Sequence, residues 1–483
     1  MRFIASTSIR ATGAQPRRAS RAARARTRAG WTALVALDLC ACSLGPAYRK
    51  PDIAPPRAWQ TTATQETVVW PSTDWWRGFN SPELDDLIAT AERANDDLAA
   101  AVARVHQAEA QVRINTAPLL PTIDASGTGT RQRQFLPMGA PLLYNLFNTQ
   151  LTAAYELDFW GKNRAVRSAT LATEAANRYD RETVELTVMA NVASTYFTVI
   201  ELRDRLSIAH ENLASAGTIL SGLKIDASVG TTTALDVAQQ ETVVATLSAA
   251  IPPLEEQLRQ QLDALAVLTG REPQQFDITR GSLDDISHPA VNPGLPAELL
   301  ARRPDVASAE AQLIAANADI QAARAAFLPN IELTAAGGFE STTLEHLLEP
   351  GSHIYNVSAG ITQPIFHGGA ILGQYQYSKA RYAELLADYH KAVISAFANV
   401  EDALTAVERS AEQLQRQQNA TDVARRAYQM SQAQFRAGTV NILTVLNTET
   451  ALFSAEDALA QVKLGHLQAL VSLFNALGGG WQR

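Results

Sequence analysis

Cys40 and Cys42 are the two thiols of this 483-residue chain, and they stand two positions apart. A disulfide between them would close a very small loop and would constrain the unfolded chain little. A metal centre would need further ligands, and no cluster of cysteine or histidine follows the pair. Because neither chemistry fits, the flanking sequence is the better guide to their role.

The segment before the cysteines has the composition of an export signal. Eight arginines precede the apolar run WTALVALDL (31–39), which has signal-peptide length and is too short to span a bilayer. The string Leu39-Cys40-Ala41-Cys42 then resembles a bacterial lipoprotein box, in which small residues precede the cysteine that receives lipid. Leu39 stands where Cys40 would need a small residue, so we expect Cys42 to be the lipidated first mature residue. The alternative is a pair of idle thiols in a disordered leader.

The other residues that could do chemistry form no enzyme signature. Eight histidines occur in no H-E-x-x-H or other ligand spacing, and neither a G-x-S-x-G nor a P-loop motif is present. Residues 1–41 hold eight arginines and one acid, so without them the formal charge falls from −8 to −15. Such an acidic chain argues against a nucleic-acid partner. We expect no enzyme activity, no metal, and no cofactor besides the covalent lipid on Cys42.

Two long repeats make up most of the sequence. Segment 111–127 matches 319–335, and segment 228–242 matches 436–450, both at an offset of 208 residues. A single period of this length indicates duplication of one large unit rather than a solenoid of short repeats.

The start of each repeat predicts a helix followed by two strands. Helices are expected at 94–117 and 305–326, and Leu-Pro ends each because proline cannot continue a helix. Segments 150–159 and 330–339 alternate apolar and polar residues, which predicts strands of about ten residues, the reach of a tilted membrane strand. Each strand pair is expected to be joined by a loop, at 136–148 in the first repeat and 343–354 in the second.

The rest of each repeat predicts a very long helix and a return helix. The long helices are expected over 163–226 and 370–436, and the return helices over 233–270 and 441–477. Pro252-Pro253 predicts a break in the first return helix. In the second long helix, apolar residues that step by three and four predict a coiled-coil seam: Tyr382, Leu386, Tyr389, Val393, Phe397, Val400, Leu404, Val407, Ala411 and Leu414.

No uninterrupted apolar run near 18 residues follows the leader, so no transmembrane helix is expected. Four strands are too few to close a barrel, and several chains must therefore share one.

Two smaller features concern packing. Trp75 and Trp76 are expected to pack in a collar rather than at a membrane interface, and Pro304 with Asp305 is expected to begin a helix.

Six strings in this order resemble TolC-like outer membrane efflux factors of the NodT/OprM lipoprotein type, with similarity from residue 42 to about 478. The strings are CSLGPAYRKP, WWRGFNSPELDDLIATAERANDDLAAAVARV, LPAELLARRPDVASAEAQLIAANADIQAARAAFLPNIEL, YELDFWGK, QPIFHGG and RAGTVNILTVLNTETALFSAE.

The resemblance implies a mainly α-helical fold with a membrane β part. Four strands per chain would contribute to a 12-stranded trimeric barrel in the outer membrane, and a long coiled-coil tunnel would extend into the periplasm. It also implies a homotrimer in contact with outer membrane lipid, a periplasmic adaptor protein and an inner membrane RND-type pump. The implied function is passive export of drugs or other small toxic compounds. The alternatives are a type I secretion duct for polypeptides and a non-conducting coiled-coil lipoprotein.

The resemblance also implies a gate and an adaptor contact at the helix tips. The gate candidates are Asp236, Thr444 and Asn447, and the second and third stand at positions that are commonly aspartates in TolC itself. Asp236 has an alternative role, because an acid also stabilises a helix N-terminus. The candidates for the tip turns and adaptor contact are Gly230, Thr231, Gly438 and Thr439.

The expected domain organisation follows the repeats. It comprises a signal peptide (1–41), a lipidated segment and collar (42–93), a first repeat (94–270), an equatorial linker (271–304), a second repeat (305–477) and a tail (478–483).

Overall fold

The computed structural model describes residues 48–60, 69–135, 139, 141–278, 281–291, 294 and 296–482, so Cys42 lies outside the described residues. The chain divides into two compact units. One contains the strands, from segments 119–164 and 321–371, and the other contains most of the helical residues. Each unit is described by itself below.

Eight α-helices are present in the described part of the chain. They are α2 (Pro82–Ala94), α3 (Asp96–Thr116), α4 (Lys162–Ser228), α5 (Ala234–Leu268), α6 (Pro296–Leu299), α7 (Pro304–Ala325), α8 (Ala370–Arg436) and α9 (Ile442–Ala476). The long and return helices begin and end within two residues of the predicted positions, and α7 begins at Pro304 as expected. None of these helices combines the length and apolarity that crossing a membrane requires.

One sequence prediction about helices needs correction. The helix expected over 94–117 is confirmed as α3, which begins at Asp96 because Asn95 caps it, with the Asn95 side chain accepting a hydrogen bond from the Leu98 amide. The predicted break at Pro252-Pro253 is wrong, since α5 runs through both prolines. Both prolines are exposed between the buried residues Ile251 and Leu254. The carbonyls that lose a partner therefore face solvent, where water can satisfy them.

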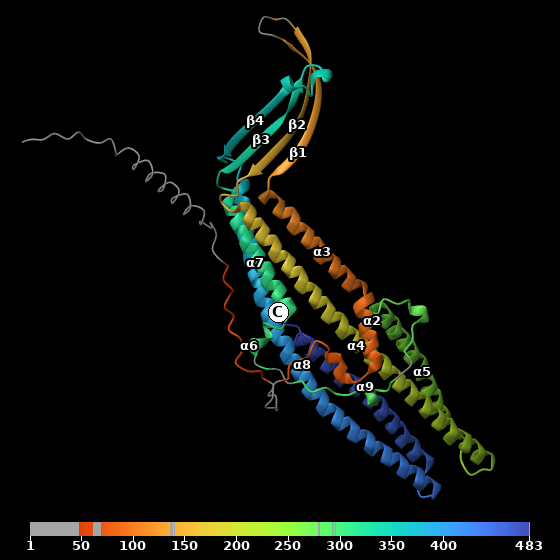
Figure 1. The fold of residues 1–483 in the computed structure, drawn as a ribbon. Helices are drawn as coiled ribbons and strands as arrows, with labels where there is room; N and C mark the ends of the chain where they lie inside the picture. Colours follow the sequence, from red (N-terminus) through yellow and green to blue (C-terminus); the bar gives the residue numbers. More distant parts are fainter. Residues whose placement is uncertain are drawn as a thin grey trace, which may run out of the picture. The chain divides into compact units, whose positions relative to one another are not determined.

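The four strands form one antiparallel sheet in the order β1-β2-β3-β4 (Figure 1). Their bounds are β1 (Thr122–Phe135), β2 (Pro141–Glu156), β3 (Asn330–Ser341) and β4 (His353–Thr362). Residues 141–148 therefore belong to β2, and the loop predicted there is wrong. The run Leu142-Leu143 does not alternate with polar residues. The search for alternating apolar and polar residues therefore missed the first half of β2.

The register gives the sheet one apolar and one polar face. The row Ala125, Leu151, Gly337 and Tyr355 crosses all four strands and is apolar. The adjacent row carries Asp124, Thr152, Ala336 and Asn356, and it points to the opposite face because side chains alternate along a strand. Large apolar side chains on the first face are more than half exposed: Ile123, Leu151, Tyr355, Val357 and Ile361.

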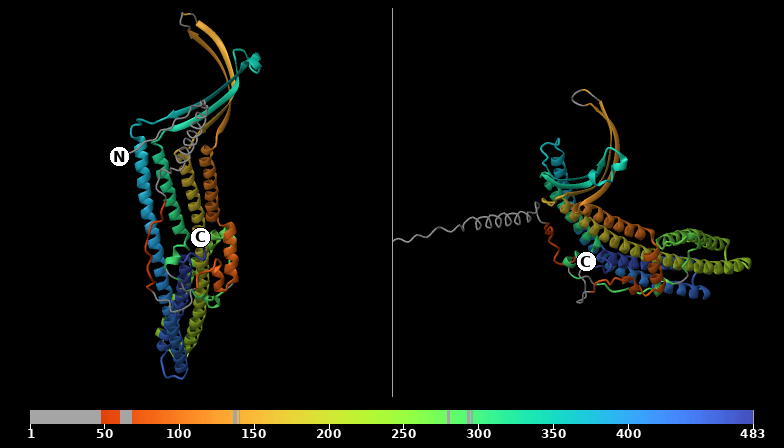
Figure 2. Two further views of the ribbon diagram at one scale, coloured as in Figure 1. Left: turned by 60° about the vertical axis from the view of Figure 1, so that its left-hand side comes forward. Right: turned by 45° about the horizontal axis from the view of Figure 1, so that its top comes forward.

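In the helical unit, α3, α4, α7 and α8 lie side by side in that order (Figure 2). The Asn115 side chain of α3 donates to the Thr170 hydroxyl of α4 at 2.7 Å. Small residues such as Ala169 and Ala315 join α4 to α7, and larger ones join α7 to α8. The predicted seam of α8 is confirmed as far as Val407: Tyr389, Val393, Val400 and Leu404 are buried, and Tyr382, Leu386, Phe397 and Val407 are partly buried. Its far end is not confirmed, since Ala411 is exposed and Leu414 lies outside this core.

The largest core of the helical unit combines aliphatic side chains with a group of aromatic rings. It joins the 3₁₀ turn η1 (Trp75–Phe79) and α2 to the middle of α4 and the end of α9. The Trp75 ring stacks on Phe474 with centroids 4.9 Å apart, and Phe79 meets Phe197 edge-on at 5.0 Å. Trp75 and Trp76 are both buried, which confirms the prediction that they pack inside the protein rather than at a membrane interface.

Gly478 offers a test of the packing at the end of α9. Its φ is +84°, and a Cβ would lie 1.8 Å from the Arg302 carbonyl oxygen. Because both the backbone conformation and the space exclude a side chain, we expect Gly478→Ala to lower the free energy of unfolding by about 1–3 kcal/mol. The thermal unfolding midpoint of the purified protein measures this.

The matched control is Gly465→Ala, an exposed position inside α9 where a Cβ meets nothing within 4 Å. It should be neutral or raise stability by about 0.5–1 kcal/mol, as alanine does inside a helix. Equal midpoints for the two variants would contradict the packing of Gly478 against Arg302.

Candidate functional site at the ends of the helical hairpins

The turns that join α4 to α5 and α8 to α9 are built alike. Gly230 and Gly438 have φ of 79° and 71°, the left-handed region that glycine adopts without strain. The following Thr231 amide bonds to the Asp226 carbonyl at 2.9 Å, and the Thr439 amide bonds to the Gln434 carbonyl at 3.0 Å. These are helix-ending Schellman motifs, in which the turn returns to carbonyls of the last helical turn. The predicted turn role of the glycines is confirmed.

The two return helices begin with related caps of different charge. In α5, the Thr233 hydroxyl and amide donate to the Asp236 carboxylate at 2.6 and 3.0 Å. In α9, the equivalent residues are Asn441 and Thr444, and the Thr444 hydroxyl and amide donate to the Asn441 side chain at 3.0 and 3.2 Å. The capping role of Asp236 is therefore confirmed, and its position in the second repeat is neutral.

Hydrogen bonding sets the electrostatics of the first cap. The bonds from Thr233, together with one from the Thr232 hydroxyl, hold the pKa of the Asp236 carboxyl below its ordinary value. The carboxylate also lies in the first turn of α5, where the helix dipole favours negative charge. Asp236 is therefore ionised at neutral pH, and it is held by its own turn.

Asn447, the third gate candidate, is exposed on α9. It lies on a stripe with Leu443, Thr450 and Ser454, which recur at three- and four-residue steps and are also exposed. The opposite side of α9 is buried. Residues on this stripe are available to another chain or to a channel interior, and none of them is charged.

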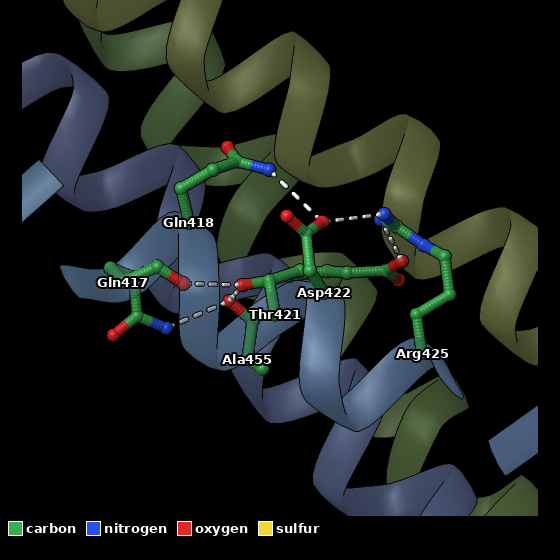
Figure 3. A network of polar contacts seen from close by, with 7 residues as sticks. Gln417, Gln418, Thr421, Asp422, Arg425 and Ala455 are labelled. Atoms are coloured by element: carbon green, nitrogen blue, oxygen red, sulfur yellow. Dashed lines mark hydrogen bonds and ion pairs between the residues drawn. The ribbon is translucent and has the colours of Figure 1, made fainter. Parts of the chain in front are cut away.

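Further along the second hairpin, polar contacts fasten α8 to α9 (Figure 3). The Thr421 hydroxyl and the Gln417 amide both donate to the Ala455 carbonyl, at 3.0 and 3.1 Å. Arg425 bridges the two helices through an ion pair with Glu456 at 3.0 Å. The spacing of α8 and α9 at this level is therefore set by directional bonds as well as by apolar packing.

The geometry brings the predicted residues together as two short clusters, one per hairpin. Gly230, Thr231 and Asp236 share the first turn, and the second holds Gly438, Thr439 and Thr444, with Asn447 one helical turn further on. Sequence reasoning missed Glu449, whose side chain is fully buried on α9. The available signal was a charged residue among apolar neighbours on that helix.

Two segments, 87–271 and 295–479, match the family model for outer membrane efflux proteins, one segment per repeat. The chain belongs to the outer membrane efflux protein family. It is an outer membrane component of an efflux system, and the TolC-like resemblance of its sequence is confirmed.

Relatives and solved structures match along nearly the whole chain. The pyoverdine export outer membrane protein OpmQ of Pseudomonas putida is 39% identical over 456 residues, which are 93% of this chain and 96% of that protein. The toluene efflux pump outer membrane protein TtgF of Pseudomonas putida is 33% identical over 464 residues, 92% of this chain and 96% of that protein. The outer-membrane channel OprN has a TM-score of 0.86 at 25% identity, covering 92% of this chain and all of that one.

Two substitutions of Asp236 separate its capping geometry from its charge. Asp236→Asn keeps an oxygen that can accept from the Thr233 amide, whereas Asp236→Ala removes both charge and acceptor. We expect hydrogen exchange in the first turn of α5 to speed up most in the alanine variant, and less in the asparagine variant, which keeps the acceptor but loses the charge.

The wild-type cap should also depend on pH. The pKa of Asp236 is lower in the folded protein than in the unfolded chain. The ionised carboxylate therefore stabilises the start of α5 at pH values above the ordinary aspartate range, and this stabilisation is lost as the pH falls through the folded pKa. Faster exchange in both variants alike would contradict the hydrogen-bonded cap and assign the effect to the charge.

Proposed function

We propose that three copies of this chain close around a common axis to form a passive outer membrane export duct for small organic compounds. In this assembly, four strands from each copy form a 12-stranded barrel, and the helical hairpins continue it as a periplasmic tunnel. Energy comes from a pump in the inner membrane, so the duct needs no catalytic residues.

The observation that carries this proposal is the sheet itself. β1 and β4 are its outer strands, and each has a single neighbour in the described chain. In hydrocarbon an unpaired edge is costly, because no water replaces the missing hydrogen bonds. Pairing β1 of one copy with β4 of the next satisfies both edges, and repetition closes a ring without free edges.

The two faces of the sheet suit the two sides of such a barrel. The exposed apolar face would contact lipid. The opposite face carries Asp124, Glu156 and Glu332, with Glu156 directly opposite Glu332 in the register and paired with Lys162 at 2.6 Å. A wall of this kind holds water, which a duct for dissolved cargo requires.

The helices suit the periplasmic part. At 67 residues each, α4 and α8 are about 100 Å long. The seam of α8 packs within the chain, while the stripe on α9 that contains Asn447 remains exposed and would face another copy or the axis. Asp236, Thr444 and Asn447 would narrow the periplasmic end, and the neutral second-repeat positions would close it through hydrogen bonds and contact rather than charge.

Partners and cargo follow from the family. The hairpin turns at Gly230, Thr231, Gly438 and Thr439 would meet a periplasmic adaptor, which would couple the duct to an RND-type pump. The relatives' names point to pyoverdine and toluene as their cargo, so small organic compounds, including drugs, are the class proposed here. The pump would select among them. A covalent lipid on Cys42 would hold the chain at the outer membrane.

Conduction by the purified protein tests the duct. We expect the chain to elute as a trimer in detergent and to give stepwise single-channel currents in planar bilayers, because a closed ring of polar-faced strands encloses water. A monomer that gives no current after reconstitution would contradict the proposal. A trimer without current would contradict the conducting role alone.

Lipidation is tested at the two cysteines separately. We expect Cys42→Ser to abolish incorporation of radiolabelled palmitate in cells, because the thiol is the acceptor. The matched control is Cys40→Ser, which should stay fully labelled. Label retained in Cys42→Ser, or lost in Cys40→Ser, would overturn the assignment of Cys42.

A further inference from the structure

Glu449 is a fully buried carboxyl on α9, one that the turns and caps described above do not involve. It is surrounded by the apolar cluster that joins the four hairpin helices near their turns. The nearest members on α9 are Val445, Leu446, Leu452 and Phe453, all buried. Burial raises the pKa of the Glu449 carboxyl, because an apolar environment disfavours the charged form.

One oxygen of this carboxyl accepts from both hairpins. The Tyr428 hydroxyl of α8 and the Ser215 hydroxyl of α4 donate to Oε1 at 3.3 and 3.4 Å. Both contacts are long for a hydrogen bond between two oxygens, which usually spans about 2.5–3.0 Å, so neither hydroxyl compensates strongly for a charge on Glu449.

The other carboxyl oxygen of Glu449, Oε2, has no hydrogen-bond donor among the described residues. The side-chain oxygen of Gln240, a neighbouring residue, also has none. Gln240 of α5 is also fully buried, and its amide nitrogen donates to the Ala216 carbonyl at 2.8 Å, which fixes the orientation of the amide. The Gln240 side chain lies within hydrogen-bond range of the Glu449 carboxyl, and as a donor it would lower the pKa of that carboxyl against the larger effect of burial. Its amide nitrogen is already bonded to Ala216, which leaves the amide oxygen for the carboxyl. Glu449 Oε2 and Gln240 Oε1 are both buried acceptors without a donor. One added hydrogen would serve both.

The charged groups on the same four helices supply no counter-ion. Lys224 of α4 pairs with Glu241 of α5 at 2.9 Å, and Arg425 of α8 pairs with Glu456 of α9 at 3.0 Å. Tyr428 is the titratable group among the partners of Glu449, and its hydroxyl is neutral over the same pH range. An ionised Glu449 would therefore be a buried charge without compensation, which is costly.

We propose that Glu449 is a proton-binding site that joins the two helical hairpins. In the protonated form, Oε2–H donates to Gln240 Oε1, and Oε1 accepts from Tyr428 and Ser215. Each of the four helices α4, α5, α8 and α9 then contributes one side chain to a single network. Loss of the proton removes the bond to Gln240 and leaves a negative charge in the apolar cluster.

The direction of the pH effect follows from the raised pKa. The Glu449 carboxyl binds its proton more tightly when the two hairpins are packed together than when they are separated. The network therefore stabilises the packed hairpins fully at low pH. This contribution decreases as the pH rises through the ordinary glutamate range toward the folded pKa. Over that interval, opening between the hairpins should become about tenfold more frequent per pH unit, as release of one proton requires.

The duplication supplies a matched control. Glu241 holds the position equivalent to Glu449 in the first repeat, 208 residues earlier, but its side chain is exposed and paired with Lys224. The same residue type therefore occupies two environments in one chain, and the proposed proton site belongs to the buried one alone.

The test is hydrogen exchange by mass spectrometry on the full-length purified protein from about pH 5 to about pH 8, corrected for the intrinsic rate. In wild type, peptides that contain Ser215, Gln240, Tyr428 and Glu449 should lose protection as the pH rises. Glu449→Gln is isosteric and neutral, so its protection should stay high and independent of pH. Glu241→Gln should keep the wild-type profile.

A second variant tests the network without removing the acid. Tyr428→Phe removes a donor that favours the ionised form, so the midpoint of the transition should move upward by roughly half a unit to one unit. An unchanged pH profile in Glu449→Gln, or the same loss of pH dependence in Glu241→Gln, would overturn the proposal. So would a downward shift in Tyr428→Phe. None of these outcomes depends on whether the protein conducts.

Discussion

Polar groups that leave water need hydrogen-bond partners, and this constraint determines much of the structure. In the sheet it applies to the backbone of β1 and β4, whose outer edges are unpaired in the described chain. In the helical unit it applies to side chains such as Gln240 and Glu449, which are fully buried. The first case calls for another copy of the chain, and the second calls for a proton. In both, one chain alone leaves a polar group unsatisfied.

The two repeats share the backbone geometry of their turns, but they differ in the side chains, or in the burial of the side chains, at equivalent positions. Both hairpins turn at a glycine with positive φ and close with the same pair of backbone bonds. The acid at the start of the first return helix, Asp236, has Thr444 as its equivalent, and the exposed Glu241 has the buried Glu449. A change of residue accounts for the first difference. A change of environment around the same residue accounts for the second, since the two hairpins pack against different neighbours.

The sequence predicted features that depend on local patterns. The long helices were placed within two residues because their apolar spacing and glycine turns are continuous, and Asp236 was recognisable as an acid that stabilises a helix N-terminus. Features that depend on neighbours distant in sequence were missed. The first half of β2 lacks alternation because a partner strand rather than periodicity defines it. The apolar neighbours of Glu449 on α9 hinted at burial, but its partners on α4, α5 and α8 are visible only once those helices are placed around it.

The helical unit changes character along its length. Around Phe79 and Phe474 the helices are joined by stacked and edge-on aromatic rings, which do not respond to pH. Glu449 lies 25 residues before Phe474, about 37 Å along α9, and there polar bonds share the packing. Contacts between these rings involve no change of charge, whereas a polar network weakens when one member changes its charge. The contacts that a change of pH can weaken therefore include those near the turns of the hairpins, and the ring contacts around Phe79 and Phe474 are not among them.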